Sequence, residues 1–273
     1  MKLFYNESIA KSLDNVDELD KIEELEDIQD ENEHIIDLWE PLEFNIDENY
    51  EYVPKSKVFS LLSNGLYYGI AFPILKVLMK IVYDFKIEGK ENIRNLKEGV
   101  VTVSNHVLFL DCAMVGLAYG FKKVYFTTLE GSFKIPFVRK LIKLLRAIPI
   151  PESIKNKGNF IKVVDNILRE ENSIHVYPEV AMFPYFDKIR HFKNGAFDFA
   201  VRNNKPIVPM VFTFREPKGI RKILKKKKDV TLTVLEPIRQ SEGENTKQRI
   251  EDLKSQVYNE MKEINNQKYK ECH

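Results

Sequence analysis

The most informative segment of the chain runs from Val101 to Asp111 and reads VTVSNHVLFLD. Its first residues favour a buried strand, Ser104 and Asn105 are good helix N-cap residues, and His106 follows directly. In an α/β fold, ligand sites are usually found where the chain leaves the carboxyl end of such a strand. The segment therefore predicts a strand and then a turn that carries His106 at the site-forming edge of a sheet.

The spacing of His106 and Asp111 restricts how the two residues can meet. Residues five apart do not share a helix face, so a continuous helix would separate them. If His106 lies at or before the first turn, Asp111 can reach its ring. A carboxylate on one ring nitrogen leaves the other nitrogen to accept a hydroxyl proton. The spacing alone is not specific, and a capping histidine beside an ordinary aspartate is the alternative.

Beyond Tyr83, strand-like segments alternate with helix-like segments. The strand-like segments are 100–104, 123–127, 173–177, 206–214 and 229–235, and the helix-like segments are 133–147, 158–171 and 244–267. This alternation predicts an α/β fold with a mostly parallel central sheet flanked by helices. We expect that domain to cover residues 84–273 and to end in an amphipathic helix.

Residues 52–83 contain the most apolar stretch of the chain, Val58 to Tyr83. A membrane-spanning helix needs about 20 consecutive apolar residues. Here Lys76 and Lys80 interrupt the stretch, and Pro73 would kink it. We therefore expect an N-terminal helical segment that associates with the membrane as an interfacial or hairpin-like element. A buried core helix is the alternative.

Charge is distributed very unevenly along the chain. Residues 1–51 carry 18 Asp and Glu against 3 Lys, whereas the remaining residues carry 39 Lys and Arg against 23 Asp and Glu. We expect residues 1–51 to be an acidic arm, either helical or disordered, that could engage a protein partner. The basic body favours an anionic membrane surface as partner, through clusters at 134–146 and 221–228. No nucleic-acid-binding motif accompanies these clusters, so nucleic acid is not expected.

The two cysteines, Cys112 and Cys272, are too few for a disulfide framework and do not form a metal-ligand pattern. The N-terminus lacks the basic-then-apolar order of a signal peptide. We therefore expect the protein on the cytoplasmic side of the membrane, attached in a peripheral or monotopic way. Cys112 adjoins Asp111 and raises the alternative of a cysteine nucleophile, although free cysteines are commonly small buried hydrophobes.

Four short motifs occur in order along the chain: Gly89-Lys-Glu-Asn-Ile93, Val103-Ser-Asn-His106 with Asp111, Tyr177-Pro-Glu179 and Lys205-Pro-Ile-Val-Pro209. Together they resemble the glycerolipid acyltransferase family, whose type member is 1-acylglycerol-3-phosphate acyltransferase. The resemblance covers residues 83–240.

The resemblance implies a reaction and assigns roles within it. A fatty-acyl group would pass from an acyl-CoA or acyl-carrier-protein thioester to a hydroxyl of a membrane lipid such as a lysophospholipid, without a metal or other cofactor. His106 would be the general base and Asp111 the residue that orients it. Glu179 would lie near the acceptor, and the strand from Pro206 to Met210 would line the site.

The chain also departs from the family pattern. Val180-Ala-Met182 stands where the family usually has Gly-Thr-Arg, and Glu152 stands where the second motif usually ends in Arg. Those arginines are expected to hold the acceptor's phosphate, because a guanidinium matches phosphate oxygens. The expected substrate-binding set is therefore Asn105, Glu179, Lys188, Arg190 and Lys193. The alternatives are an acyltransferase for a hydroxyl acceptor without phosphate, such as a glycolipid or envelope sugar, and an inactive lipid-binding scaffold.

Overall fold

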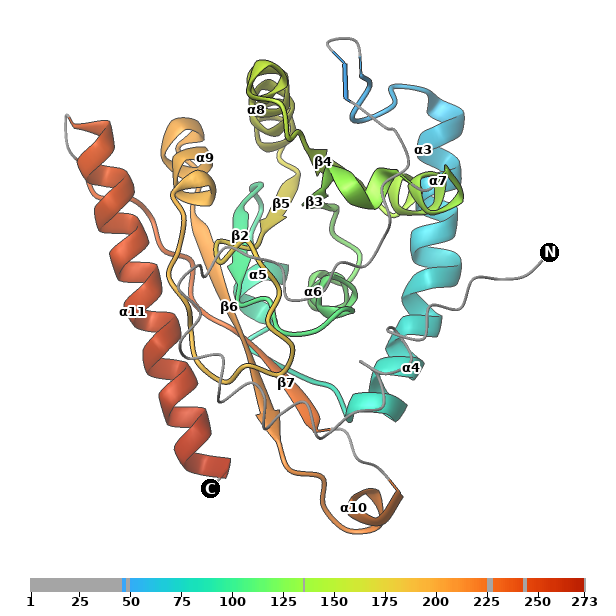
Figure 1. Ribbon diagram of the computed structural model, residues 1–273, viewed down its shortest axis with the longest axis vertical. Helices are drawn as coiled ribbons and strands as arrows, with labels where there is room; N and C mark the ends of the chain where they lie inside the picture. The colour runs from blue at the N-terminus through green and yellow to red at the C-terminus, as the bar shows by residue number, and fades with distance from the viewer. Residues whose placement is uncertain (1–45, 48–49, 135, 225–227, 243–244, 273) are drawn as a thin grey trace.

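A computed structural model describes residues 46–47, 50–134, 136–224, 228–242 and 245–272 (Figure 1). Within these residues the chain forms a seven-stranded sheet of order β1-β7-β6-β2-β5-β3-β4. The strands are β1 (Lys86–Glu88), β2 (Val101–Ser104), β3 (Val124–Leu129), β4 (Ala147–Ile150), β5 (Ser173–Val176), β6 (Ile207–Arg215) and β7 (Asp229–Val234). Nearly all of the predicted acidic arm lies outside the described residues.

The sheet is mostly parallel, as predicted. The five strands from β6 to β4 pair in parallel, whereas β7 pairs antiparallel with β6 and parallel with β1. Gly89, which follows β1, has φ +67°, and a Cβ there would lie 2.1 Å from the Val234 carbonyl oxygen. Only glycine fits this approach of β1 to β7 without strain.

Helices cover both faces of the sheet, which explains why the central strands β2 and β5 are buried on both sides. One core packs α4 (Phe72–Tyr83), α5 (Glu91–Arg94) and α6 (Asp111–Tyr119) against the sheet. The other core packs α8 (Ile154–Arg169), α9 (Gly195–Asn203) and α11 (Thr246–Cys272) against the opposite face (Figure 1). Further helices are η3 (Glu130–Phe133), α7 (Pro136–Leu144) and α10 (Ile220–Leu224).

The apolar N-terminal segment is a single helical element of 27 residues, Lys57–Tyr83. It comprises α3 (Lys57–Asn64), a π-helical stretch η2 (Gly65–Ala71) and α4. The hairpin-like form of the prediction is therefore wrong. Pro73, the second residue of α4, directly follows the π-helical stretch, and the helical element continues through it.

One side of this helix packs on the domain and the other side is exposed. The Tyr67 side chain is buried against α6, where a Cβ on Gly116 would meet the Tyr67 hydroxyl at 2.6 Å. The exposed apolar side chains are Val58, Leu61, Leu62, Ile70, Ile74, Val77, Leu78 and Ile81. The element is long and apolar enough to cross a membrane by length and composition, and only 11% of its most apolar window is buried. The buried-core-helix alternative is thereby wrong.

Candidate active site

The loop between β2 and α6 carries the predicted pair. His106 lies in this loop, and Asp111 is the first residue of α6, so the pair does not have to share a helix face. The Asp111 carboxylate oxygen Oδ2 lies 2.7 Å from His106 Nδ1. Asp111 is buried, whereas 21% of the His106 side chain is exposed. The carboxylate thus fixes one ring nitrogen of a histidine whose ring is partly open to solvent.

Tyr177 supports both members of the pair. Its ring stacks on the His106 ring with centroids 3.9 Å apart, and its hydroxyl donates to Asp111 Oδ1 at 2.6 Å. Burial and the Asp111 charge raise the pKa of Tyr177 well above its usual value, so the hydroxyl stays protonated and donates. The contact arises because β2 and β5 are parallel neighbours, with Val103 opposite Val176, and their carboxyl ends meet at one edge.

Glu179 and Arg190 form a buried clamp behind the histidine loop. Glu179 Oε2 accepts a hydrogen bond from the His106 backbone N–H at 3.2 Å, and Oε1 accepts from the Arg190 backbone N–H at 2.9 Å. The Arg190 guanidinium lies 3.4 Å from Glu179, bonds to the Ala181 carbonyl and lies over the Phe183 ring. Burial raises the pKa of the Glu179 carboxyl, while Arg190 opposes that rise. Both residues were predicted to bind substrate, and this geometry instead favours a positioning role.

The other predicted substrate-binding residues lie in three different settings. Asn105 is buried, and its side-chain amide exchanges two hydrogen bonds with the Phe212 backbone at 2.8 and 3.0 Å. This pairing ties the end of β2 to β6, so a positioning role is favoured for Asn105 as well. Lys188 and Lys193 are exposed in the segment that follows Glu179. Their binding of substrate stays a prediction.

The turn after Pro178 carries backbone strain. Val180 adopts φ +68°, a left-handed conformation in which a β-branched side chain is strongly disfavoured. The family usually has glycine at this position, and glycine tolerates such a φ. In this chain the strained position is therefore occupied by a β-branched residue. Val180 and Phe109 are 41% and 57% exposed, so the two site loops present apolar side chains to solvent.

Two neighbouring groups that invite a catalytic interpretation are held inert by burial. Burial and the adjacent Asp111 raise the pKa of the Cys112 thiol to about 12, which disfavours a cysteine nucleophile. Burial lowers the pKa of His175 to about 3, and its ring nitrogens lie 2.9 Å from the Thr102 hydroxyl and 3.3 Å from the Ser104 hydroxyl. The raised thiol pKa of Cys112 and the buried contacts of His175 favour structural roles for both groups. Among the described residues, no group of three or more His, Cys, Asp or Glu side chains could hold a metal ion.

The role of Tyr177 could not be predicted from its own motif. The signal that could have found it is the strand order. Tyr177 directly follows β5, and it meets the loop after β2 only because β2 and β5 are neighbours in the sheet.

A histidine held by a carboxylate at the carboxyl edge of a parallel α/β sheet is an arrangement suited to general-base catalysis. Residues 84–213 match the family model described as Acyltransferase. These residues form an acyltransferase domain, which bears out the recognition of acyltransferase motifs in the sequence and supports an acyltransferase as the enzyme.

Among solved structures, the chain is similar to the 1-acyl-sn-glycerophosphate (LPA) acyltransferase PlsC from Thermotoga maritima. The sequence identity is 22%, the TM-score is 0.46, and the match covers 74% of this chain and 79% of that chain. No curated protein sequence matches this chain.

Proposed function

We propose that the protein transfers a fatty-acyl group from an acyl-CoA or acyl-carrier-protein thioester to a hydroxyl of a lipid acceptor, with lysophosphatidate as the leading candidate. The observation that supports this most is the 2.7 Å contact between His106 Nδ1 and the buried Asp111 carboxylate. It leaves His106 Nε2 as the nitrogen that can accept a proton from an incoming hydroxyl. The match of residues 84–213 to an acyltransferase family supports the same chemistry.

The proposed reaction proceeds by direct attack. His106 Nε2 accepts the proton of the acceptor hydroxyl as the hydroxyl oxygen bonds to the thioester carbonyl carbon. The tetrahedral intermediate then collapses, the carbon–sulfur bond breaks, and His106 returns the proton to the thiolate. The products are an ester and a free thiol. Asp111 stabilises the imidazolium form of His106 between these two transfers.

The membrane is the proposed location of the acceptor. The exposed apolar side of Lys57–Tyr83 offers an interfacial docking surface, because apolar side chains gain free energy by entering the acyl region. Its other side is packed on the domain, which favours monotopic attachment. Ile220 and Ile223 of α10 are also exposed, and Arg221 of α10 donates to the Ile81 carbonyl at 3.3 Å. They extend the same surface.

The experiment is thioester turnover by the purified protein, measured as thiol release with lysophosphatidate as acceptor. His106→Ala is expected to lower turnover by about 10²- to 10⁴-fold, the usual contribution of general-base catalysis. Cys112→Ser is the matched control and is expected to keep most activity. Near-normal turnover by a folded His106→Ala protein, or an acyl group trapped on Cys112, would contradict the mechanism.

A second candidate is an acceptor that carries no phosphate near its reacting hydroxyl. The observation that favours it is the ion pair between Arg190 and Glu179, which occupies the buried arginine of this region. Any phosphate contact from residues 188–193 would then come from the exposed side chains of Lys188 and Lys193. Glu152, 68% exposed and 3.8 Å from Lys134, adds negative charge where the family usually has an arginine. Lys188→Ala and Lys193→Ala separate the two acceptor classes. If these lysines bind the phosphate, both substitutions should raise the KM for lysophosphatidate and leave the KM for a monoacylglycerol unchanged. If the natural acceptor lacks the phosphate, neither substitution should change the KM for that acceptor.

A further inference from the structure

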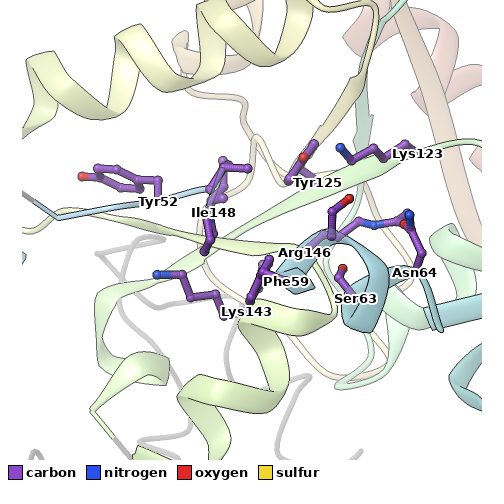
Figure 2. Close-up of a pocket in the computed structure, with 13 residues that line it drawn as sticks. Tyr52, Phe59, Ser63, Asn64, Lys123, Tyr125, Lys143, Arg146 and Ile148 are labelled. Carbon is purple, nitrogen blue, oxygen red and sulfur yellow. The ribbon is translucent and has the colours of Figure 1, made fainter. Parts of the chain in front are cut away.

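A pocket lies on the edge of the sheet opposite to His106. His106 follows the carboxyl end of β2, whereas Lys123 and Arg146 directly precede the amino ends of the parallel strands β3 and β4. The pocket is open to solvent and has a cavity volume of about 40 Å³ between α3, α7, the segment 52–54 and these strand starts (Figure 2). It is lined by Tyr52, Val53, Pro54, Phe59, Ser60, Ser63, Asn64, Lys123, Tyr125, Lys143, Arg146, Ala147 and Ile148.

The charged side chains that line this pocket are all cations. Lys123 and Lys143 lie on either side of Arg146 in Figure 2, and the lining includes no Asp or Glu. The Lys143 ammonium donates to the Glu51 carbonyl at 2.6 Å and lies 4.8 Å from the Tyr50 ring centroid. The Lys123 ammonium lies 5.1 Å from the Tyr125 ring centroid. Within the described part of the chain, none of the three cations forms an ion pair.

Arg146 is the most unusual of these cations, because only 3% of it is exposed. Its guanidinium donates to the Tyr68 hydroxyl at 3.1 Å and to Asn64 Oδ1 at 2.7 Å, and it lies over the Tyr67 ring. Its buried Nε has no hydrogen-bond partner among the described residues. A buried cation without a carboxylate is costly, and so is a buried donor without an acceptor.

Two further observations show that this arrangement of cations is costly. Burial lowers the pKa of Lys143 even though Glu51 acts to raise it, so the charged form is disfavoured there. Arg146 adopts φ +68°, a left-handed conformation that costs free energy for a residue with a Cβ. An anion between the cations would reverse the first of these costs and would supply the acceptor that Arg146 Nε lacks.

We propose that this pocket binds a phosphate group, supplied by free phosphate or by a phospholipid headgroup. Its oxygens would accept from Lys123, Lys143 and Arg146, and charge-assisted bonds of this kind are the strong ones. Phe59 and Ser63 of α3 line the pocket, while Leu61 and Leu62 of the same helix are exposed apolar side chains. A headgroup at the membrane surface could therefore reach it. The proposal concerns binding and does not depend on the function of His106.

The test is isothermal titration of the full-length protein with two probes, inorganic phosphate and monomeric dihexanoyl phosphatidate. We expect saturable binding of at least one probe at a single pocket that depends on Lys123 and Lys143. Lys123→Gln and Lys143→Gln should each weaken that binding about tenfold, the loss expected for one charge-assisted hydrogen bond. Lys140→Gln, an exposed change on the same helix as Lys143, is the matched control and should bind as the wild type does.

The outcomes separate the two sources of phosphate. Binding of both probes indicates a general phosphate site, and binding of the phosphatidate alone indicates a lipid headgroup site. The proposal is overturned if neither probe binds saturably, or if Lys123→Gln and Lys143→Gln bind as tightly as Lys140→Gln. That second result would place any bound phosphatidate elsewhere, including at His106. Lys123→Gln keeps the test decisive if Lys143→Gln does not fold, because the Lys123 ammonium contacts only an aromatic ring among the described residues.

Discussion

At the scale of single residues, the hydroxyl of Tyr177 connects the candidate base to the core of the protein. Tyr177→Phe keeps the ring that stacks on His106 and removes the 2.6 Å bond to Asp111. We expect kcat to fall about tenfold, since hydrogen bonds to charged groups contribute about 1.5–3 kcal/mol.

The matched control for Tyr177→Phe is Tyr125→Phe, which removes a hydroxyl at the opposite edge of the sheet. It should leave kcat unchanged. A Tyr177→Phe protein with wild-type kcat would show that the Tyr177 hydroxyl does not position the pair.

His175 predicts how stability depends on pH. In the unfolded chain a histidine binds a proton below a pH of about 6.5, whereas burial lowers the folded pKa of His175 to about 3. Between these pH values folding must release the proton, so the free energy of unfolding falls as the pH is lowered. Denaturant unfolding from pH 7 to pH 4 should show that slope, and His175→Gln should reduce it. Equal slopes for the two proteins would contradict a neutral buried His175.

At the scale of elements, the apolar side of Lys57–Tyr83 is the proposed membrane contact. Leu61→Asn and Ile74→Asn change exposed side chains, so we expect no loss of folding stability. Each should weaken co-sedimentation with lipid vesicles about tenfold or more, because burying one such side chain contributes about 1.5–3 kcal/mol. Ile154→Asn changes an exposed isoleucine at the start of α8 and should bind like the wild type. Equal losses in all three variants would show that the helix is not the specific contact.

The elements that the sequence predicted are those with a clear local pattern. The strands β2, β3, β5, β6 and β7 are confirmed, because each is a run of β-branched and aromatic residues between turn signals. The edge strand β4 was missed because it combines a short length with Pro149, and because the predicted helix 133–147 already covered its first residue. The helix α6 was missed because it is buried on nearly every side and therefore shows no alternation of polar and apolar residues.

The site was predictable only in part, for a related reason. The His106–Asp111 pair is local in sequence, and the predicted strand placed it correctly at the carboxyl edge. The predicted helix cap at Ser104 and Asn105 is wrong, because α6 begins only at Asp111. The Glu179–Arg190 clamp and the Asn105–Phe212 pairing depend on which strands become neighbours and on which side chains become buried. Sequence motifs identified Glu179 and Arg190 as polar residues near the site, but they could not show that the two side chains pair with each other.

At the scale of the whole molecule, the separation of charge predicts a dependence on salt. Residues 52–273 carry 39 Lys and Arg against 23 Asp and Glu. We expect binding to anionic vesicles to weaken as salt rises, because salt screens exposed charges. Binding to neutral vesicles should be weaker and nearly independent of salt, since it reports the apolar contact alone. Equal binding to both vesicle types at low salt would contradict the electrostatic part of the membrane proposal.

The strand order also determines when the candidate site can form during folding. His106 lies on the loop after β2, but the residues that hold this loop arrive much later in the chain: Glu179 after β5, and Phe212 within β6. Parallel strands so far apart in sequence pair slowly, because the intervening chain must be ordered first. During synthesis the N-terminal part emerges first, so a nascent chain that ends before residue 179 has His106 and Asp111 without the clamp. The chain therefore completes its catalytic loop only after most of its length has been made.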